Sequence, residues 1–268
     1  PWPPDSPHRF TLSLTAMTYC LAVAVEHGLV FVSDSRTNAG IDQLGTFSKM
    51  HRFDQLEGRF FTLLSAGNLA TTQAVVAKLE RDIRDNATIS LASVQRIREA
   101  ADYIGQTSRM IQDKYSEQEG VDGFSPEADF IFGGQIGAEL HKLFHIYPQG
   151  NYLSPTELAP FLQIGEQKYG RPILDRIIRH DTALETVARC GLVSMDSTMR
   201  SNASVGPPIE LLMYRAGGPP GSATHIVYSD DDPYLRMIRE AWAENLRQAF
   251  DKLPPICIPS TSVRLVDS

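Results

Sequence analysis

A pair of strand-like runs near the start of the chain constrains its fold more than any other feature. Residues 19–25 and 29–34 are rich in residues that favour β-structure, and Glu26-His27-Gly28 between them is typical of a hairpin turn. The chain is therefore expected to begin with two adjacent antiparallel strands.

Blocks of strand and helix patterns follow along the rest of the chain. Apolar runs bounded by turn residues indicate strands, and apolar residues at helical spacing indicate helices. The predicted strands lie at 58–65, 128–132, 142–147, 161–164, 209–214 and 224–228, and the predicted helices at about 69–85, at about 91–115, near Thr182 and after Asp232. A parallel sheet would require regular βα alternation, so this order predicts an α+β fold. The expected form is a four-layer αββα sandwich of two antiparallel sheets between helix layers.

Two of these helices carry start signals. Thr182 and Glu185 fit a capping box, and Asp232 followed by Pro233 fits a capped first turn. The apolar face of the last helix is expected to be buried along its whole length, at Leu235, Ile238, Trp242, Leu246 and Ala249.

The composition is that of a globular protein with one sizeable core. Of 268 residues, 42% are hydrophobic and 21% are charged, and no apolar run approaches the ~18 residues of a membrane span. The formal net charge of −7, without a basic stripe, argues against binding to nucleic acid or to an anionic membrane.

Cysteine and histidine usage argues against several kinds of site. Cys20, Cys190 and Cys257 are odd in number and far apart, which supports neither a disulfide framework nor a zinc knuckle and favours a cytoplasmic location. None of the seven histidines stands with a serine and an aspartate in a recognisable motif, and His-Glu-x-x-His is absent. No metal or other cofactor is therefore expected.

Residues 1–17 are interpreted as a tail that precedes a single domain at 18–268. Four prolines occur in the first seven residues, and the following stretch is too short and too polar for a signal peptide. The tail is either a propeptide or sequence upstream of the true start. The second is favoured, because Met17 resembles an initiator methionine whose removal would leave Thr18 first.

Thr18 has the chemistry of a nucleophile if it becomes the first residue. It would then carry a hydroxyl and a free α-amine, and an α-amine titrates at roughly 7.7–8.0, so it can act as base for that hydroxyl. Asp34 and Lys49 are the charges such a site needs. Without further context, Thr18 would be an ordinary strand residue. Cys20 is also nucleophilic in type, but its place in an inward-alternating strand assigns it to the core.

Seven short segments, taken in order, indicate a family. They are Met17–Cys20, Ser33–Gly40, Thr46–His51, Leu64–Asn68, Phe132–Gly134, Gly165–Gly170 and Ser194–Asn202. Together they resemble the proteasome β-subunit superfamily of N-terminal-nucleophile (Ntn) hydrolases, and within it the bacterial Anbu (ancestral β-subunit) branch, close to the HslV peptidase. The match covers nearly the whole chain from Met17 onward and implies the Ntn-hydrolase form of the sandwich.

The resemblance also implies catalytic roles. Thr18 would be the nucleophile and its amine the proton acceptor, with Asp34 and Lys49 orienting it and Lys49 lowering the pKa of the hydroxyl. Gly67 would supply a backbone N–H to the oxyanion, because the absence of a Cβ permits close approach.

Substrate contacts follow from the same resemblance. Thr37 and Asn38 would offer backbone groups to an extended peptide, which is a form of strand addition. Ser65, Ala66 and Leu69 would shape the pocket for the side chain that precedes the cut.

Two positions depart from the family pattern. Proteasome β-subunits carry a serine where this chain has Glu166, and an aspartate where it has Ser201, while Ser204 matches the serine of their Asp-x-x-Ser. Glu166, Ser201 and Ser204 therefore stand where the family has polar helpers of the nucleophile's amine. Glu166 would restore a carboxylate near that amine.

These observations support three functions. The leading one is a threonine-type endopeptidase acting through a Thr18 acyl-enzyme inside a self-assembled homo-oligomer, a ring or a helical spiral, with contacts on the outer faces of the helices at 69–115. The others are an assembly scaffold that has lost turnover and a hydrolase of a small non-peptide amide. The chain has no nucleotide-binding motif, so an ATP-driven unfoldase would be a separate partner.

Overall fold

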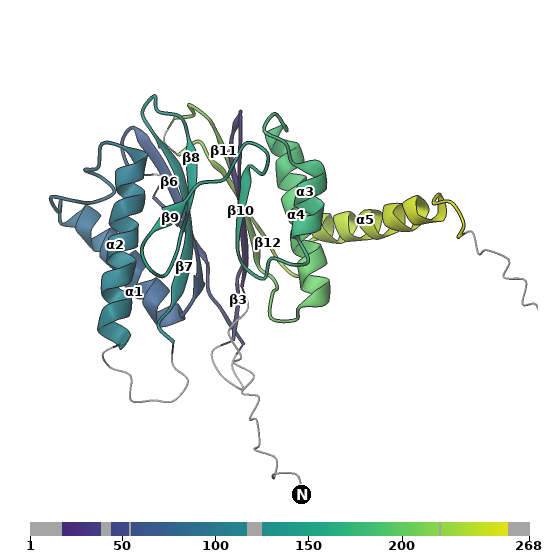
Figure 1. Cartoon of the computed structure of the whole chain (residues 1–268), viewed down its shortest axis with the longest axis horizontal. Helices are drawn as coiled ribbons and strands as arrows, with labels where there is room; N and C mark the ends of the chain where they lie inside the picture. The colour runs from purple at the N-terminus through teal and green to yellow at the C-terminus, as the bar shows by residue number, and fades with distance from the viewer. Residues whose placement is uncertain (1–17, 39–43, 54, 117–124, 220, 257–268) are drawn as a thin grey trace, which may run out of the picture.

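The computed structural model describes residues 18–38, 44–53, 55–116, 125–219 and 221–256. Within these ranges, two antiparallel sheets of five strands each pack face to face between helices (Figure 1). One sheet is covered by α1 (Leu69–Arg84) and α2 (Ile97–Ser116), and the other by α4 (Leu184–Ser201) with α3 (Arg171–Ile177) beside it. The predicted α+β class and αββα order are confirmed.

The first sheet contains the start of the described chain. Its strands are β1 (Tyr19–Val25), β2 (Gly28–Asp34), β10 (Phe161–Gly165), β11 (Ile209–Arg215) and β12 (Thr224–Tyr228). Their order is β10-β1-β2-β11-β12, and all neighbours are antiparallel. β1 and β2 form the predicted hairpin, in which Cys20 pairs with Ser33.

The second sheet has the order β5-β6-β7-β8-β9. Its strands are β5 (Met50–Arg52), β6 (Arg59–Gly67), β7 (Ala128–Ile136), β8 (Lys142–Ile146) and β9 (Tyr152–Leu153). Between β2 and β5, the short strands β3 (Arg36–Asn38) and β4 (Leu44–Thr46) pair as a separate two-stranded ribbon.

The side chains of β1 are buried on both faces of the first sheet. Leu21 and Val23 pack toward α3 and α4, while Cys20 and Ala22 pack in the layer between the two sheets. Because both faces are covered, the strand has a continuous apolar sequence rather than an alternating one. Cys20 has no exposed surface, so its assignment to the core is confirmed, although the expected inward alternation of this strand is wrong because both faces are buried.

Helix α5 (Pro233–Asp251) projects from the body of the molecule (Figure 1). The residues of its predicted buried face fall into two groups: Leu235 and Ile238 are buried and Trp242 is half-buried, whereas Leu246 is 49% exposed and Ala249 is also exposed. The prediction of burial along the whole helix is therefore wrong for its second half. The amphipathic pattern continues there, but the described body ends alongside the first half.

The two predicted helix starts have different outcomes. Asp232 caps α5, since its carboxylate accepts hydrogen bonds from N–H groups of the first turn. Thr182 does not cap α4, because its hydroxyl accepts the N–H of Arg179 at 2.8 Å and so closes the preceding turn. Helix α4 begins at Leu184, after Ala183, which offers no side-chain cap.

Helix α2 begins at Ile97 rather than at about residue 91. The carboxylate of Glu99 accepts the N–H groups of the two residues before α2, which fixes the start of the helix there. Upstream, the guanidinium of Arg59 binds the carbonyl oxygens of Leu91 and Val94 at 2.8 and 3.0 Å.

Helix α3 was not predicted from the sequence. Its seven residues are too few to establish a helical period.

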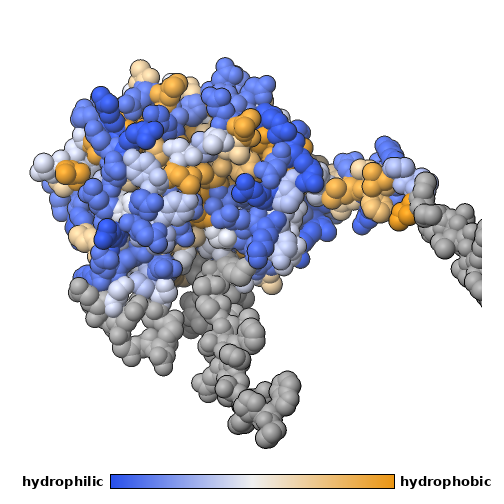
Figure 2. All heavy atoms as spheres, in the orientation of Figure 1, coloured by the Kyte–Doolittle hydropathy of each residue, from blue (hydrophilic) through white to orange (hydrophobic). Residues whose placement is uncertain are grey.

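The surface of the body is mixed in character, and apolar side chains line the projecting part of α5 (Figure 2). Among them, Phe250 is 72% exposed, and Leu253, just beyond the helix, is 61% exposed. No helix in the described part of the chain combines the length and the apolar character needed to cross a membrane.

Candidate active site

Asp34 is the centre of a buried polar cluster at the end of β2. Its side chain has no exposed surface. Its Oδ1 accepts the N–H of Tyr19 at 3.0 Å and binds Lys49 Nζ at 2.7 Å, and its Oδ2 accepts the N–H of Gly206 at 3.3 Å. Burial raises the pKa of Asp34 above its ordinary value, while Lys49 and the two N–H donors lower it.

Lys49 enters the cluster from the segment just before β5. Its Nζ also donates to the carbonyl oxygen of Arg36 at 2.7 Å, and its side chain is only 9% exposed. An ammonium group has three donors. Within the described residues two of them bind Asp34 and Arg36, so the third can address a group placed beside Asp34.

Thr18 is anchored through its backbone beside this ion pair. Its carbonyl oxygen accepts the N–H of Glu166 at 2.7 Å, and the N–H of the next residue, Tyr19, binds Asp34. Gly165 has a φ of +79°, and a Cβ there would collide with the carbonyl group of Thr18. Thr18 is 5% exposed. The structure thus brings Thr18 and the Asp34–Lys49 pair together, while their catalytic roles stay a prediction.

Gly67 ends β6 and is exposed. Its φ is +98°, and a Cβ there would collide with the carbonyl oxygen of Glu127, so the position requires glycine. Two residues earlier, Ser65 donates its N–H to the carbonyl oxygen of Lys49 at 3.0 Å. This bond connects the end of β6 to the Asp34–Lys49 pair.

The three residues predicted to shape the substrate pocket also lie near this strand end. Ser65 and Ala66 are buried, and Leu69, the first residue of α1, is half-buried. Neighbouring strand residues point to opposite faces, and Ala66 packs between the sheets, so Ser65 and Ala66 line different surfaces. The hydroxyl of Ser65 lies 3.4 Å from Nε2 of His51, whose pKa is lowered to about 4 by burial.

Thr37 and Asn38 lie in β3, where they pair with Gly45 and Leu44 of β4. Among the residues that the structure describes, no strand pairs with the other edge of β3. An extended peptide could pair with that edge, as the predicted strand addition requires.

Three residues were predicted to help the amine of Thr18: Glu166, Ser201 and Ser204. Glu166 is the one whose backbone binds Thr18 directly. It is 7% exposed, and its carboxylate accepts the N–H of Lys168 at 3.2 Å and the side-chain amide of Asn202 at 3.4 Å. Ser204 donates its N–H to Oδ1 of the same Asn202 at 3.0 Å. Ser201 ends α4 and is exposed. The loop after α4 therefore reaches Thr18 through Glu166.

Three residues of the cluster did not stand out in the sequence as functional. Tyr19, Asn202 and Gly206 bind partners that are 15, 36 and 172 residues away in the chain, so no local pattern marks them. The Gly206-Pro207 pair is a turn signal, which identifies Gly206 as a loop residue but not as a donor to Asp34.

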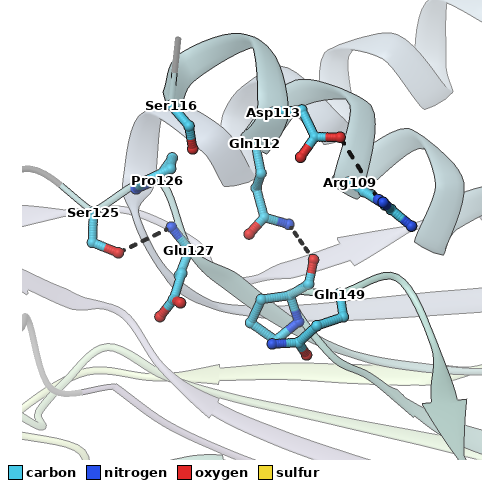
Figure 3. A pocket seen from close by; sticks show the side chains of 9 residues that line it. Arg109, Gln112, Asp113, Ser116, Ser125, Pro126, Glu127 and Gln149 are labelled. Atoms are coloured by element: carbon cyan, nitrogen blue, oxygen red, sulfur yellow. Dashed lines mark hydrogen bonds and ion pairs between the residues drawn. The ribbon is translucent and has the colours of Figure 1, made fainter. Parts of the chain in front are cut away.

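A polar hollow of about 560 Å³ lies between the end of α2 and the segment before β7 (Figure 3). It is lined by Arg109, Gln112, Asp113, Ser116, Ser125, Pro126, Glu127, Pro148 and Gln149. Glu127 links it to the end of β6, since its carbonyl oxygen accepts the N–H of Asn68 at 2.8 Å. No residue of the Asp34 cluster lines this hollow. The described residues contain no group of three or more His, Cys, Asp or Glu that could hold a metal ion.

No protein-family model matches the chain, and no curated protein matches it. Solved structures do match. Anbu (ancestral β-subunit) from Yersinia bercovieri is 42% identical with a TM-score of 0.82, over 90% of this chain and 100% of that one. The chain belongs to the Anbu family.

Two further Anbu structures agree with this assignment. The helical assembly of the Anbu complex from Pseudomonas aeruginosa is 41% identical with a TM-score of 0.83, over 90% of this chain and 98% of that one. Anbu from Hyphomicrobium sp. strain MC1 is 41% identical with a TM-score of 0.79, over 90% and 100%. The predicted Anbu membership is confirmed, and the proteasome-like Ntn-hydrolase sandwich with it.

Proposed function

We propose that this Anbu-family chain is an N-terminal threonine hydrolase that cleaves peptide bonds through an acyl-enzyme on Thr18. The observation that carries the proposal is the buried Asp34–Lys49 pair, which binds the backbone next to Thr18. A buried ion pair is often no more stabilising than apolar side chains of similar volume. Its place beside a threonine with an anchored backbone supports a catalytic use.

Acylation needs a base and a positive charge at Thr18. In the form of the chain that begins at Thr18, the α-amine takes the hydroxyl proton as Oγ attacks the carbonyl carbon of the substrate. The ammonium of Lys49 stabilises the negative charge that develops on Oγ. The intermediate then collapses, the protonated α-amine gives its proton to the leaving amine, and an ester remains on Thr18.

Deacylation uses the same amine. It takes a proton from a water molecule, whose oxygen attacks the ester carbonyl, and the proton returns to Oγ as the acid is released. In both steps the backbone N–H of Gly67 is the proposed donor to the oxyanion. The exposed end of β6, tied to Lys49 through Ser65, supports this role.

Glu166 is the proposed partner of the α-amine. Its N–H binds the carbonyl oxygen of Thr18, and its carboxylate is held by Lys168 and Asn202, so a negative charge is kept close to the residue that bears the amine. Ser204 would act indirectly, through Asn202. Ser201 is exposed at the end of α4, so its predicted role rests on the sequence alone.

The edge of β3 that none of the described strands pairs with favours a peptide over a small amide. An extended peptide can pair with backbone groups of Thr37 and Asn38. A small amide lacks the extended backbone that such pairing requires.

We also propose that the chain assembles with copies of itself. A relative, the Anbu complex of Pseudomonas aeruginosa, is described as a helical assembly. In this chain the second half of α5 exposes Leu246 and Phe250, at 49% and 72%, and such an apolar surface favours contact with another copy. These contacts would add to those predicted on the outer faces of the helices at 69–115.

Light scattering tests the assembly. Phe250→Asp is expected to lower the mass of the assembly, because it places a charge on the exposed apolar surface of α5. Leu158→Asp is the control, since Leu158 is 92% exposed in the loop before β10. Equal masses for both variants would contradict a role for α5.

Hydrolysis assays test the activity. The chain made to begin at Thr18 is expected to cleave fluorogenic peptides, and Thr18→Ala is expected to abolish cleavage without changing the assembly. Cleavage of small amides alone would favour the small-amide alternative. Absence of both activities in a folded assembly would favour the scaffold alternative, which is motivated by the departures from the family pattern at positions 166 and 201.

A further inference from the structure

A nucleophile that is the first residue of its chain is anchored by a single peptide bond. Its own carbonyl group and the residue that follows must therefore supply the orientation that catalysis requires. In this chain the following residue is Tyr19, and the mechanism proposed above uses only its N–H.

Tyr19 joins three elements through its side chain. The ring is completely buried in the core between the first sheet and α4. Its hydroxyl lies 2.6 Å from Oγ of Ser194 on α4 and 2.7 Å from Nε2 of Gln163 on β10. Because the N–H of Tyr19 also binds Asp34 at 3.0 Å, both its backbone and its side chain are fixed.

The same hydroxyl packs against the segment that holds Thr18. Glu166 donates its N–H to the carbonyl oxygen of Thr18 at 2.7 Å. In the same segment Gly170 lies so close to the hydroxyls of Tyr19 and Ser194 that a Cβ would collide with both. Loss of the tyrosine hydroxyl would therefore loosen the two hydrogen bonds that hold Thr18. These are the bond from the N–H of Glu166 to the carbonyl oxygen of Thr18 and the bond from the N–H of Tyr19 to Asp34.

Gln163 has one polar atom that no described residue satisfies. Its amide nitrogen binds the hydroxyl of Tyr19, and its Oε1 is buried without a partner among the described residues. Turning the amide over would only leave the nitrogen without a partner instead. A buried unpartnered polar atom is destabilising, so a core selected for folding alone would favour an apolar residue here.

We propose that Tyr19 is a positioning residue for the nucleophile. Its hydroxyl, held by Ser194 and Gln163, fixes the orientation of Thr18 toward Asp34 and Lys49. The inference rests on the proposed function and adds a dependence of Thr18 reactivity on a hydroxyl that does not touch the substrate.

Tyr214 provides a matched control at the other end of the sandwich. It is 4% exposed, and its hydroxyl donates to Oε1 of Gln135 at 2.7 Å. In β11 it pairs with Leu29 at the start of β2, whereas Asp34 ends that strand. Tyr214→Phe therefore also removes a buried Tyr–Gln hydrogen bond, but away from Thr18.

The test measures covalent labelling of the chain that begins at Thr18 by a peptide epoxyketone. Wild type, Tyr19→Phe and Tyr214→Phe are compared by intact mass at several probe concentrations, which separates the maximal labelling rate from the apparent affinity. Tyr19→Phe is expected to lower the maximal rate about tenfold with little change in affinity, and Tyr214→Phe to leave both within about twofold. Equal rates for Tyr19→Phe and wild type, or equal slowing in both variants, would overturn the proposal.

Hydrogen exchange gives a second measurement that does not depend on labelling. Peptides covering 18–25 and 163–170 are expected to exchange faster in Tyr19→Phe than in Tyr214→Phe, and unchanged exchange would overturn the proposal. If Tyr19→Phe exchanges faster than Tyr214→Phe but the wild type is not labelled by the probe, the proposed function fails and the anchoring of Thr18 by Tyr19 stands. Should Tyr19→Phe not fold, Ser194→Ala removes one partner of the hydroxyl and is expected to slow labelling to a smaller extent.

Discussion

The two ends of the sandwich are closed by buried polar groups of different kinds. β2 runs from Gly28 at one end to Asp34 at the other. At the Asp34 end, the carboxylate binds the ammonium of Lys49 and two backbone N–H groups. At the Gly28 end the buried network around Gln135 is neutral: its Oε1 accepts the hydroxyl of Tyr214 at 2.7 Å and a backbone N–H at 2.9 Å.

The difference separates what folding needs from what function needs. A neutral network closes one end of the sheets with its hydrogen bonds satisfied and no charge to desolvate. The charged end must offset the removal of two ions from water, which is why a buried ion pair is weak evidence for stability. Among the described residues, the buried Lys49–Asp34 ion pair lies at the end that holds Thr18, so the proposed function assigns it to chemistry at Thr18 rather than to the fold.

The largest expected effect comes from Lys49→Met. It removes the charge proposed to stabilise the attacking oxygen and leaves Asp34 buried without its cation. Hydrolysis is expected to fall on the order of 10³-fold or more, and stability by about 3–5 kcal/mol. Gln135→Met at the neutral end is the control, expected to lower the melting temperature and to spare hydrolysis. Hydrolysis by Lys49→Met within tenfold of wild type would remove the distinction between the ends.

Gly67→Ala is expected to have the next largest effect. A Cβ would collide with the carbonyl oxygen of Glu127, so the end of β6 must move and carry its N–H away from the oxyanion. A loss of about 10²-fold in hydrolysis is expected. Gly137→Ala is the control, because its φ is also positive at +52° but the space around its Cβ is open. It is expected to cost about 1–2 kcal/mol and no activity; equal losses of activity would contradict the assignment of Gly67.

Lowering the pH should reduce the free energy of unfolding through His51, which lies at the Asp34 end of the sandwich. Burial lowers its pKa to about 4 from 6.5, so between these values the unfolded chain binds the proton first. Its contribution to stability is thus complete above pH 6.5 and is lost as the pH falls toward 4, by about 3 kcal/mol. His51→Gln is expected to flatten this part of the curve of unfolding free energy against pH. His141, half-buried at the other end and with a pKa also lowered by burial, should contribute less. A larger flattening by His141→Gln would reverse the comparison.

The smallest expected effect is that of Asn68→Ala. The side chain of Asn68 caps α1 by accepting the N–H of Thr71 at 3.1 Å, directly after Gly67. Loss of this cap is expected to cost about 1 kcal/mol in chemical denaturation and to change hydrolysis less than threefold or so. Asp232→Ala, at the cap of α5, should cost a similar amount. A drop in hydrolysis of tenfold or more for Asn68→Ala alone would extend the site to the start of α1.

The sequence was most informative where burial leaves a periodic trace. β1 and β12 have the predicted bounds because their turn residues and apolar runs are local signals. The same reasoning failed for the second half of α5, since an amphipathic pattern shows that a face is apolar but not whether the body reaches it. It also failed for Thr182, whose hydroxyl serves a turn instead of a helix.

For the candidate site, the sequence identified the charged groups and missed their supports. Asp34 and Lys49 followed from the family segments that contain them. The roles of Tyr19 and Gly206 depend on hydrogen bonds between segments brought together only by the fold, at separations of up to 175 residues. No pattern in a single segment records such a bond.

The most direct test of the central claim is intact-mass and peptide mapping after incubation with a peptide epoxyketone. This probe closes a stable ring only when a free amine and an activated hydroxyl belong to the same residue. The chain made to begin at Thr18 is compared with a matched chain that keeps Met17 before it. One adduct, mapped to Thr18 and formed only by the first chain, is the predicted result. No adduct on the folded chain that begins at Thr18, or an adduct on any other residue, would contradict the account.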